Sequence, residues 1–123
     1  MRLNKIHHIA IIASNYEVSK KFYTEILGLE VIREVYRKER DSYKLDLKLG
    51  DSEIELFSFP NVPVRPSYPE ARGLRHLAFE VDNIDEAIAE LNLHGIECEP
   101  IRIDEFTGKR FTFFEDPDKL PLE

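Results

Sequence analysis

The sequence predicts an α+β fold in which two β-α-β-β-β modules pair about a pseudo-twofold axis and form a cup-shaped mixed sheet. The second half of the chain repeats the first at an offset of 68 residues, and each half opens with a β-rich run that leads into a capped amphipathic helix. At 123 residues the chain suits one domain. We therefore expect module one at 1–59, a proline-rich linker at 60–72 and module two at 73–123.

The repeat carries polar residues as well as apolar ones. Residues 73–83 restate residues 5–15, with apolar residues matched at alternate positions. The same offset aligns two pairs of polar residues: His8 with His76, and Glu55 with Glu123. Each half therefore has a histidine near its start and a glutamate at its end, at the same separation.

Module one begins with a strand over residues 5–13, which places His8 on one face and His7 on the other, so His7 is expected to be structural. Asn15 is a credible N-cap for a helix over 16–27, and Gly28 suits its C-terminal stop.

Three further strands are expected at 29–36, 43–49 and 52–59. In the last of them Glu55 shares a face with Phe57 and Phe59. A carboxylate and two aromatic rings are thus predicted on one side of the sheet.

Module two repeats this order. A strand is expected at 73–81, followed by a helix that Asn83 caps and Gly95 ends. Strands near 97–103 and 110–115 follow, and a turn at 116–118 leads into a last strand that ends at Glu123. Four prolines keep residues 60–72 out of the sheet.

Bulk composition excludes several classes of function. The chain has 42% hydrophobic and 33% charged residues, as soluble globular proteins do. It has no apolar run long enough to span a bilayer and no signal-peptide pattern at its N-terminus. We therefore expect a cytoplasmic protein that does not bind membranes. A net charge of −7 argues against nucleic acid as a partner and leaves a small-molecule substrate. The single cysteine, Cys98, excludes an internal disulfide.

The repeated residues predict a metal site at His8, Glu55, His76 and Glu123. Each alone is more often a structural or solvated residue, but packing gives no reason to keep a histidine and a glutamate in both halves. Two imidazoles and two carboxylates suit one divalent transition metal, Zn²⁺, Ni²⁺, Co²⁺, Mn²⁺ or Fe²⁺, and are too nitrogen-rich for Ca²⁺ or Mg²⁺.

Several other side chains are candidates for binding substrate. Cations could hold a carboxylate or phosphate, and aromatic rings could form an apolar wall, although surface charge and core packing are common alternatives. The preferred candidates are Arg110, Lys44, Phe57, Phe59 and Phe114, and the further cations are Arg40, Arg75 and Lys109.

The chain resembles the vicinal oxygen chelate superfamily, which has the glyoxalase and bleomycin-resistance fold. The resemblance covers nearly the whole chain and rests on "HHIAII" at 7–12, "FYTEILGLEV" at 22–31, "RHLAFEVDN" at 75–83 and "EDPDKLPLE" at 115–123. The bacterial glyoxalase I metal set falls on His8, Glu55, His76 and Glu123.

The resemblance implies a lyase or isomerase like glyoxalase I, whose metal chelates vicinal oxygens of a small substrate and stabilises an enediolate. It also implies that Glu123 or Glu55 is the catalytic base and that the protein is a homodimer, with the site inside one chain or across two. The thiol stays open. So do two other functions: a metabolite- or drug-binding protein of the bleomycin-resistance type, and a metal-dependent thiol transferase.

Overall fold

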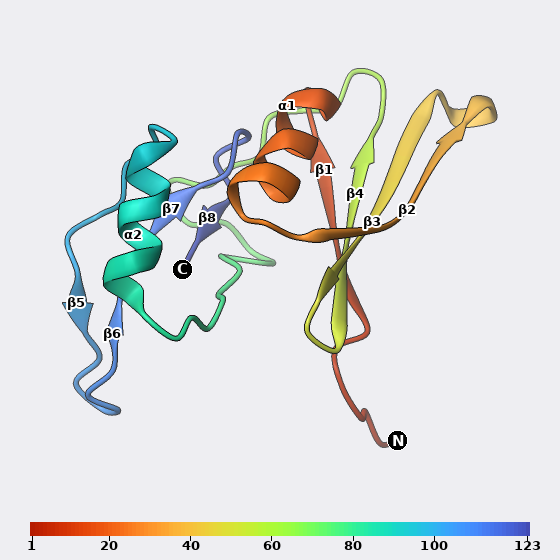
Figure 1. Ribbon diagram of the computed structural model, residues 1–123. Coiled ribbons are helices and arrows are strands. Elements are labelled where there is room, and N and C mark those ends of the chain that lie inside the picture. Colours follow the sequence, from red (N-terminus) through yellow and green to blue (C-terminus); the bar gives the residue numbers. More distant parts are fainter. The chain divides into compact units, whose positions relative to one another are not determined.

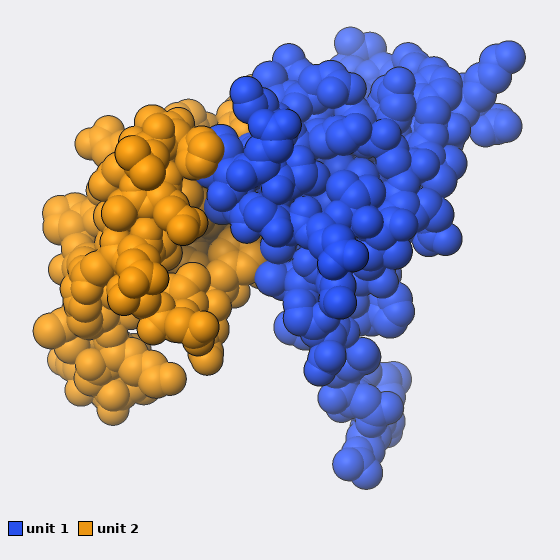
Figure 2. Space-filling view, viewed as in Figure 1, with its two compact units in different colours: residues 1–63 blue, residues 64–123 orange.

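A computed structural model describes residues 1–123, which form two compact units, Met1–Pro63 and Val64–Glu123 (Figure 1; the units are coloured in Figure 2). Residues 59–76, which join the last strand of one unit to the first paired segment of the other, contain turns but no helix or strand. Neither unit contains a helix that is long and apolar enough to cross a bilayer.

The first unit has the predicted β-α-β-β-β order. Its four-stranded sheet has the order β1-β4-β3-β2, with β1 parallel to β4 and the other neighbours antiparallel. The elements are β1 (His8–Ala13), α1 (Tyr16–Lys21), the π-helical turn η1 (Phe22–Ile26), β2 (Glu30–Arg37), the 3₁₀ turn η2 (Lys38–Arg40), β3 (Ser42–Leu49) and β4 (Ser52–Ser58). The sequence therefore located the four strands and the helical segment of this half to within a few residues, and did not predict the turn η2.

The helix begins and ends where its capping residues predict. The Asn15 side chain accepts a hydrogen bond from the Val18 backbone N–H at 3.2 Å. The last turns widen, so that the Leu27 N–H donates to the Phe22 carbonyl at 2.9 Å. Gly28 then adopts φ 72°, a left-handed conformation that a side chain disfavours.

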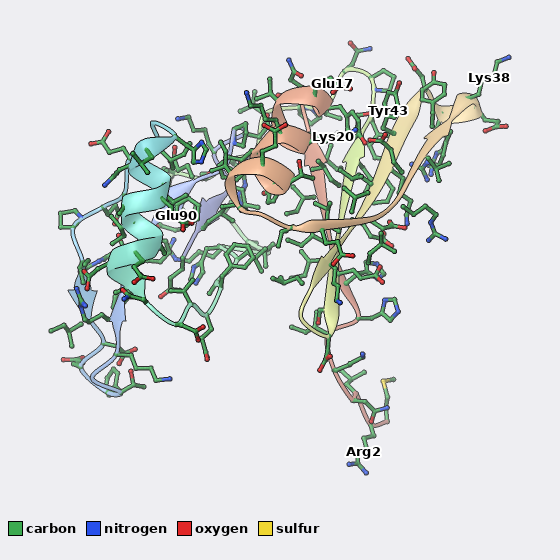
Figure 3. The ribbon with its side chains drawn as sticks, viewed as in Figure 1. Arg2, Glu17, Lys20, Lys38, Tyr43 and Glu90 are labelled. Carbon is green, nitrogen blue, oxygen red and sulfur yellow. The ribbon has the colours of Figure 1, made fainter.

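One face of the first sheet forms the core of its unit. Helix α1 covers this face (Figure 1). The Tyr16 ring on α1 stacks on the Tyr43 ring on β3, with their centroids 4.5 Å apart (Tyr43 is labelled in Figure 3). The fully buried apolar side chains of this unit are Ala13, Tyr23, Leu45, Leu47, Ile54 and Leu56. Because side chains alternate along each strand, the intervening residues point to the other face, where His8 and Glu55 lie.

The second unit has shorter strands than the sequence predicts. Its elements are α2 (Ile84–Leu93), β5 (Arg102–Ile103), β6 (Arg110–Phe111), β7 (Phe114–Glu115) and β8 (Pro121–Leu122). Asn83 caps α2 as expected by accepting from the Asp85 and Glu86 backbone N–H groups. Strand β5 pairs with β6, and β7 pairs with β8, both antiparallel.

The predicted strand at 73–81 is wrong in its extent. In place of that strand, residues 73–81 contain a single parallel bridge, between Leu77 and Leu122, with backbone hydrogen bonds beside it. In the first unit the Glu53 N–H donates to the His7 carbonyl at 3.1 Å. The residue at the equivalent position of the second half is Pro121, which has no N–H, so this ladder is one bond shorter.

The predicted strands at 97–103 and 110–115 are also too long. Between β6 and β7 the Thr112 side-chain hydroxyl donates to the Glu99 carbonyl at 2.6 Å, and the Glu99 N–H donates to the Phe113 carbonyl at 2.8 Å. The segments therefore still contact each other outside the short strands.

The two units nevertheless keep the register of the repeat. Ile9 lies opposite Ile54 in the β1–β4 pair, and an offset of 68 residues converts these positions to Leu77 and Leu122, which also pair in parallel. The α+β fold class is confirmed.

Candidate functional site

The first histidine–glutamate pair lies on two neighbouring strands. His8 opens β1, and Glu55 is in the middle of β4 opposite Ala10, so both side chains point to the face of the sheet away from α1. The His8 Nε2 and Glu55 Oε2 atoms are 3.6 Å apart, which is too long for a hydrogen bond. Glu55 is largely enclosed, whereas His8 is 42% exposed.

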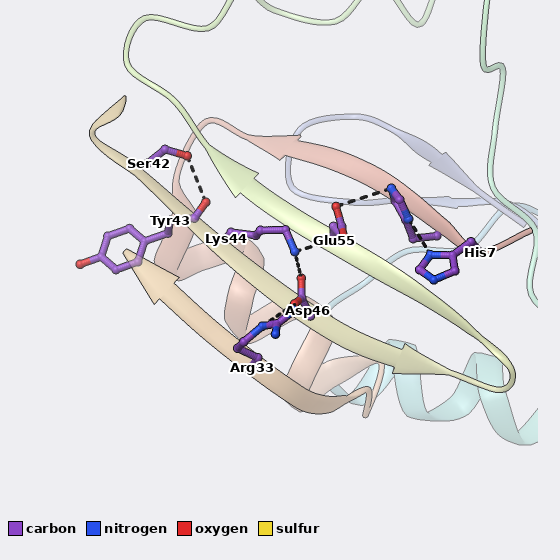
Figure 4. A network of polar contacts seen from close by, with 8 residues as sticks. His7, Arg33, Ser42, Tyr43, Lys44, Asp46 and Glu55 are labelled. Carbon is purple, nitrogen blue, oxygen red and sulfur yellow. Dashed lines mark hydrogen bonds and ion pairs between the residues drawn. The ribbon is translucent and has the colours of Figure 1, made fainter. Parts of the chain in front are cut away.

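A chain of charged groups continues from Glu55 across this face (Figure 4). The Lys44 ammonium lies 3.1 Å from Glu55 and also contacts Asp46, which the Arg33 guanidinium holds from the other side at 2.8 Å. Asp46 is only 1% exposed, so it needs both partners. Burial opposes the charge of Lys44, but hydrogen bonds to Asp46 and Glu55 outweigh it and raise the pKa of Lys44.

The expectation that His7 points away from His8 is wrong. The two Nδ1 atoms are 2.9 Å apart and the rings meet edge to face (Figure 4). His7 precedes the first paired residue of β1, so strand alternation does not constrain it. One of the two Nδ1 atoms must carry a proton in this contact. If His8 donates, its Nε2 is the unprotonated nitrogen, the form that binds metals.

The second pair repeats the arrangement in the other unit. His76 directly precedes Leu77, and Glu123 directly follows Leu122. The parallel bridge between Leu77 and Leu122 therefore makes His76 and Glu123 diagonal neighbours, as His8 and Glu55 are in the first unit. The His76 Nε2 and Glu123 Oε2 atoms are 2.9 Å apart, within ion-pair distance. The Phe113 ring packs edge-on against His76 at 5.1 Å. The Nδ1 atom of His76 is buried without a partner.

The structure places the four predicted ligands as two separate pairs, one in each unit. Neither unit alone holds a group of three or more metal-binding side chains. The chemistry of the donors fits a transition metal, because each pair directs an imidazole Nε2 toward a carboxylate oxygen. Two ligand atoms that bind one ion at about 2.1 Å lie roughly 3 to 3.6 Å apart, the separation of both pairs.

The two carboxylates differ in their surroundings. Glu55 has the Lys44 ammonium beside it, whereas the ion-pair partner of Glu123 is His76. The nearest basic residue in sequence, Lys119, pairs instead with Glu115 at 3.0 Å. No lysine or arginine side chain therefore pairs with Glu123.

The substrate-binding candidates have varied surroundings. Phe57 and Phe59 stack at 5.8 Å on the Glu55 side of the sheet, with the Arg40 guanidinium 5.6 Å from the Phe59 ring. Arg110 makes a bidentate ion pair with Asp85, which holds the pKa of that carboxyl below its usual range. Phe114 lies in β7, opposite Leu122. Arg75 pairs with Glu70, and the Lys109 backbone N–H donates to the Thr107 hydroxyl at 3.3 Å.

Sequence reasoning missed several residues of this face, among them Asp46 and Arg37. The alternation of β3 was a usable signal for Asp46, because it is two residues from Lys44 and must share its face. For Arg37 there was no such signal, since its neighbours come from the β2–β3 register that only the structure gives.

Comparisons with known proteins give a consistent result. Residues 5–123 match the family described as the Glyoxalase/Bleomycin resistance protein/Dioxygenase superfamily. The uncharacterized protein YwkD of Bacillus subtilis is 64% identical, over 100% of this chain and 97% of its own length. The crystal structure of a glyoxalase family protein from Enterococcus faecalis superposes with a TM-score of 0.91, at 61% identity, over 99% of this chain and 97% of that chain.

More distant relatives have named activities. Human methylmalonyl-CoA epimerase is 30% identical over 94% of this chain and 69% of its own length. The trypanothione-dependent glyoxalase I of Leishmania major superposes with a TM-score of 0.71, at 26% identity, over 98% of this chain and 84% of that chain.

Proposed function

Since the chain belongs to the Glyoxalase/Bleomycin resistance protein/Dioxygenase superfamily, we propose that it is a divalent-metal-dependent lyase or isomerase of the glyoxalase I type. Its substrate would be a small molecule with two vicinal oxygens. The observation that carries the proposal is the pair of matched contacts, His8 with Glu55 at 3.6 Å and His76 with Glu123 at 2.9 Å.

In this proposal His8, Glu55, His76 and Glu123 together hold one Zn²⁺, Ni²⁺, Co²⁺, Mn²⁺ or Fe²⁺ ion. The four residues come from one chain or from two copies of it, and a cytoplasmic homodimer is part of the proposal. When bound, the ion supplies a Lewis acid that polarises a substrate carbonyl and makes the neighbouring C–H bond more acidic.

The carboxylate of Glu123 is the better candidate for the base. It would take a proton from the carbon beside the carbonyl and return it to the adjacent carbon, a transfer that rearranges the substrate without loss of atoms. Glu55 is less suited, because the Lys44 ammonium already occupies one of its carboxylate oxygens at 3.1 Å. His76 lies beside Glu123, with Nε2 2.9 Å from Oε2, so both would face the same ion.

The proposal is tested first by metal content, measured by elemental analysis on protein without a histidine tag. We expect about one transition metal per chain, lost in His76→Ala. His94→Ala is the matched control, because His94 caps the C-terminus of α2 and belongs to neither pair. Adducts of 2-oxoaldehydes with different thiols are then screened as substrates of the metal-loaded protein.

The outcomes separate the three candidate functions. Isomerisation of an adduct supports the lyase. Formation of a stable product that consumes the thiol supports a metal-dependent thiol transferase instead. Failure of the wild type to take up metal after reconstitution contradicts both and leaves the metabolite- or drug-binding protein.

A further inference from the structure

Arg37 is a partly buried cation without a carboxylate partner. It is the last residue of β2, and its Nη2 donates to the Ser42 hydroxyl at 2.9 Å. Its Nε–H group is buried and has no acceptor. Other arginines of the chain pair with carboxylates: Arg33 with Asp46, Arg102 with Glu99, and Arg110 with Asp85.

Two aromatic rings hold the Arg37 guanidinium in place. Its carbon lies 5.0 Å from the centre of the Phe57 ring and 5.6 Å from that of Phe59, and the two rings are stacked. Such cation–π contacts fix the plane of the group and keep water from one side of it. They supply no hydrogen-bond acceptor, so the Nε–H group stays unsatisfied.

This arrangement adjoins the candidate metal ligands. Arg37 lies opposite Ser42 in the β2–β3 pair, and Lys44 lies opposite Phe57 in the β3–β4 pair. The Lys44 ammonium lies 5.9 Å from the centre of the Phe57 ring and 3.1 Å from Glu55. The cluster is therefore continuous with Glu55 on one face of one sheet.

A buried N–H donor on a cation costs free energy unless an acceptor satisfies it, and a charged acceptor satisfies it best. The chain has 24 acidic residues against 17 basic ones, yet none of the acidic residues pairs with Arg37. We propose that Arg37, Ser42, Phe57 and Phe59 form a subsite for the oxyanion, carboxylate or phosphate, of a small molecule.

The oxyanion accepts from the Arg37 Nε–H group and rests against the edges of the two rings. Its assignment to the substrate rests on the proposed function: the substrate then carries an anionic group near its vicinal oxygens. Binding of the anion itself needs no metal, so the two proposals can fail separately.

The test is a titration of metal-free protein, kept in chelator, with inorganic phosphate and separately with acetate, followed through the arginine Nε–H signals by NMR. Sodium chloride at matched ionic strength corrects for screening. The signal that Arg37→Lys removes is expected to move on titration, with a dissociation constant on the order of millimolar. Arg102→Lys is the matched control, because Arg102 also lies over two rings, Phe111 and Phe113, but pairs with Glu99.

Binding is expected to weaken roughly tenfold or more in Arg37→Lys and to stay unchanged in Arg102→Lys. Ser42→Ala keeps the guanidinium but loses its fixing hydrogen bond, and should weaken binding by a smaller factor. A response to phosphate supports a phosphorylated or phosphonate ligand, and a response to acetate alone supports a carboxylate.

The proposal is overturned if the Arg37 signal moves no more with either anion than with chloride. It is also overturned if Arg37→Lys binds as the wild type does. A wild type that binds the anion but takes up no metal after reconstitution would contradict the proposed function alone. A metal-loaded protein that binds neither anion would contradict the subsite alone.

Discussion

The Lys44 ammonium lies 3.1 Å from the Glu55 carboxylate. The repeat gives Glu123 the same place in the other half of the chain, but there the neighbour is His76 and no lysine or arginine. Two glutamates that the sequence presents as equivalent therefore differ in their charged neighbours, and this difference supports separate roles for them.

Glu123→Gln is expected to lower kcat by about 10² to 10⁴, because the amide cannot accept a proton from carbon. Glu55→Gln is expected to lower metal affinity more than kcat at saturating metal. Kinetics of both variants at several metal concentrations, with the adduct found in the substrate screen, check this. Equal loss of kcat in the two variants at saturating metal would contradict the assignment of Glu123 as the base.

Lys44→Met is expected to destabilise the fold by about 1 to 3 kcal/mol. The substitution keeps most of the side-chain length but leaves the buried Asp46 with Arg33 as its one cation. Urea unfolding measures the change. Lys48→Met, on the same strand and without an ion pair, is the control and should change stability by less than about 0.5 kcal/mol.

His7→Ala is expected to weaken metal binding roughly tenfold or more, and His8→Ala to abolish it. The reason is the contact of the two Nδ1 atoms at 2.9 Å, which orients the His8 ring and sets which nitrogen carries its proton. Competition with a metal-binding dye measures both affinities. If His7→Ala binds metal as tightly as the wild type, the contact has no part in the site.

Much of the first unit could be predicted because each signal was local. The cap at Asn15, the stop at Gly28 and the alternation of β4 each depend on residues close in sequence. The repeat also relates positions that are far apart in the chain, because its offset of 68 residues converts the Ile9–Ile54 pair seen in the structure to Leu77 and Leu122. A histidine and a glutamate lie beside each of these two pairs, at positions that the repeat aligns.

The other features of the fold and the site could not be predicted, because the repeat hid them or because they depend on strand boundaries and register. Pro121 removes one bond from the ladder of the second half, a local effect that the repeat concealed. The contact of His7 with His8 depends on where β1 begins to pair, and a strand boundary is the least certain part of a sequence-based assignment. Arg37 meets its aromatic partners through strand register, which links residues far apart in the chain.

The acid stability of the protein should depend on Asp46. Burial disfavours the charged form of this carboxyl, but hydrogen bonds from Lys44 and Arg33 outweigh it and lower the pKa of Asp46. A lowered pKa in the folded state means that the contribution to stability is complete above the unfolded pKa, about 4, and is lost as pH falls through the folded value. Urea midpoints from about pH 6 to about pH 3 should therefore fall less steeply in Asp46→Asn than in the wild type. Parallel curves would show that other carboxyls govern acid unfolding.

The core beneath the site should be the most sensitive part of the first unit. Leu56 is fully buried on the α1 face of β4, next to Glu55 in sequence, and pairs across the sheet with Leu45 and Ile11. Leu56→Ala removes buried methyl groups and leaves a cavity, so a loss of about 2 to 5 kcal/mol is expected in the free energy of unfolding. Leu93→Ala on α2, where the side chain is 86% exposed, is the control and should change stability by less than about 0.5 kcal/mol.

Because Glu55 is held by the backbone of the same strand, Leu56→Ala should also lower metal affinity, and dye competition on the folded variant measures that coupling. An unchanged affinity would show that the strand keeps its position without its core contact.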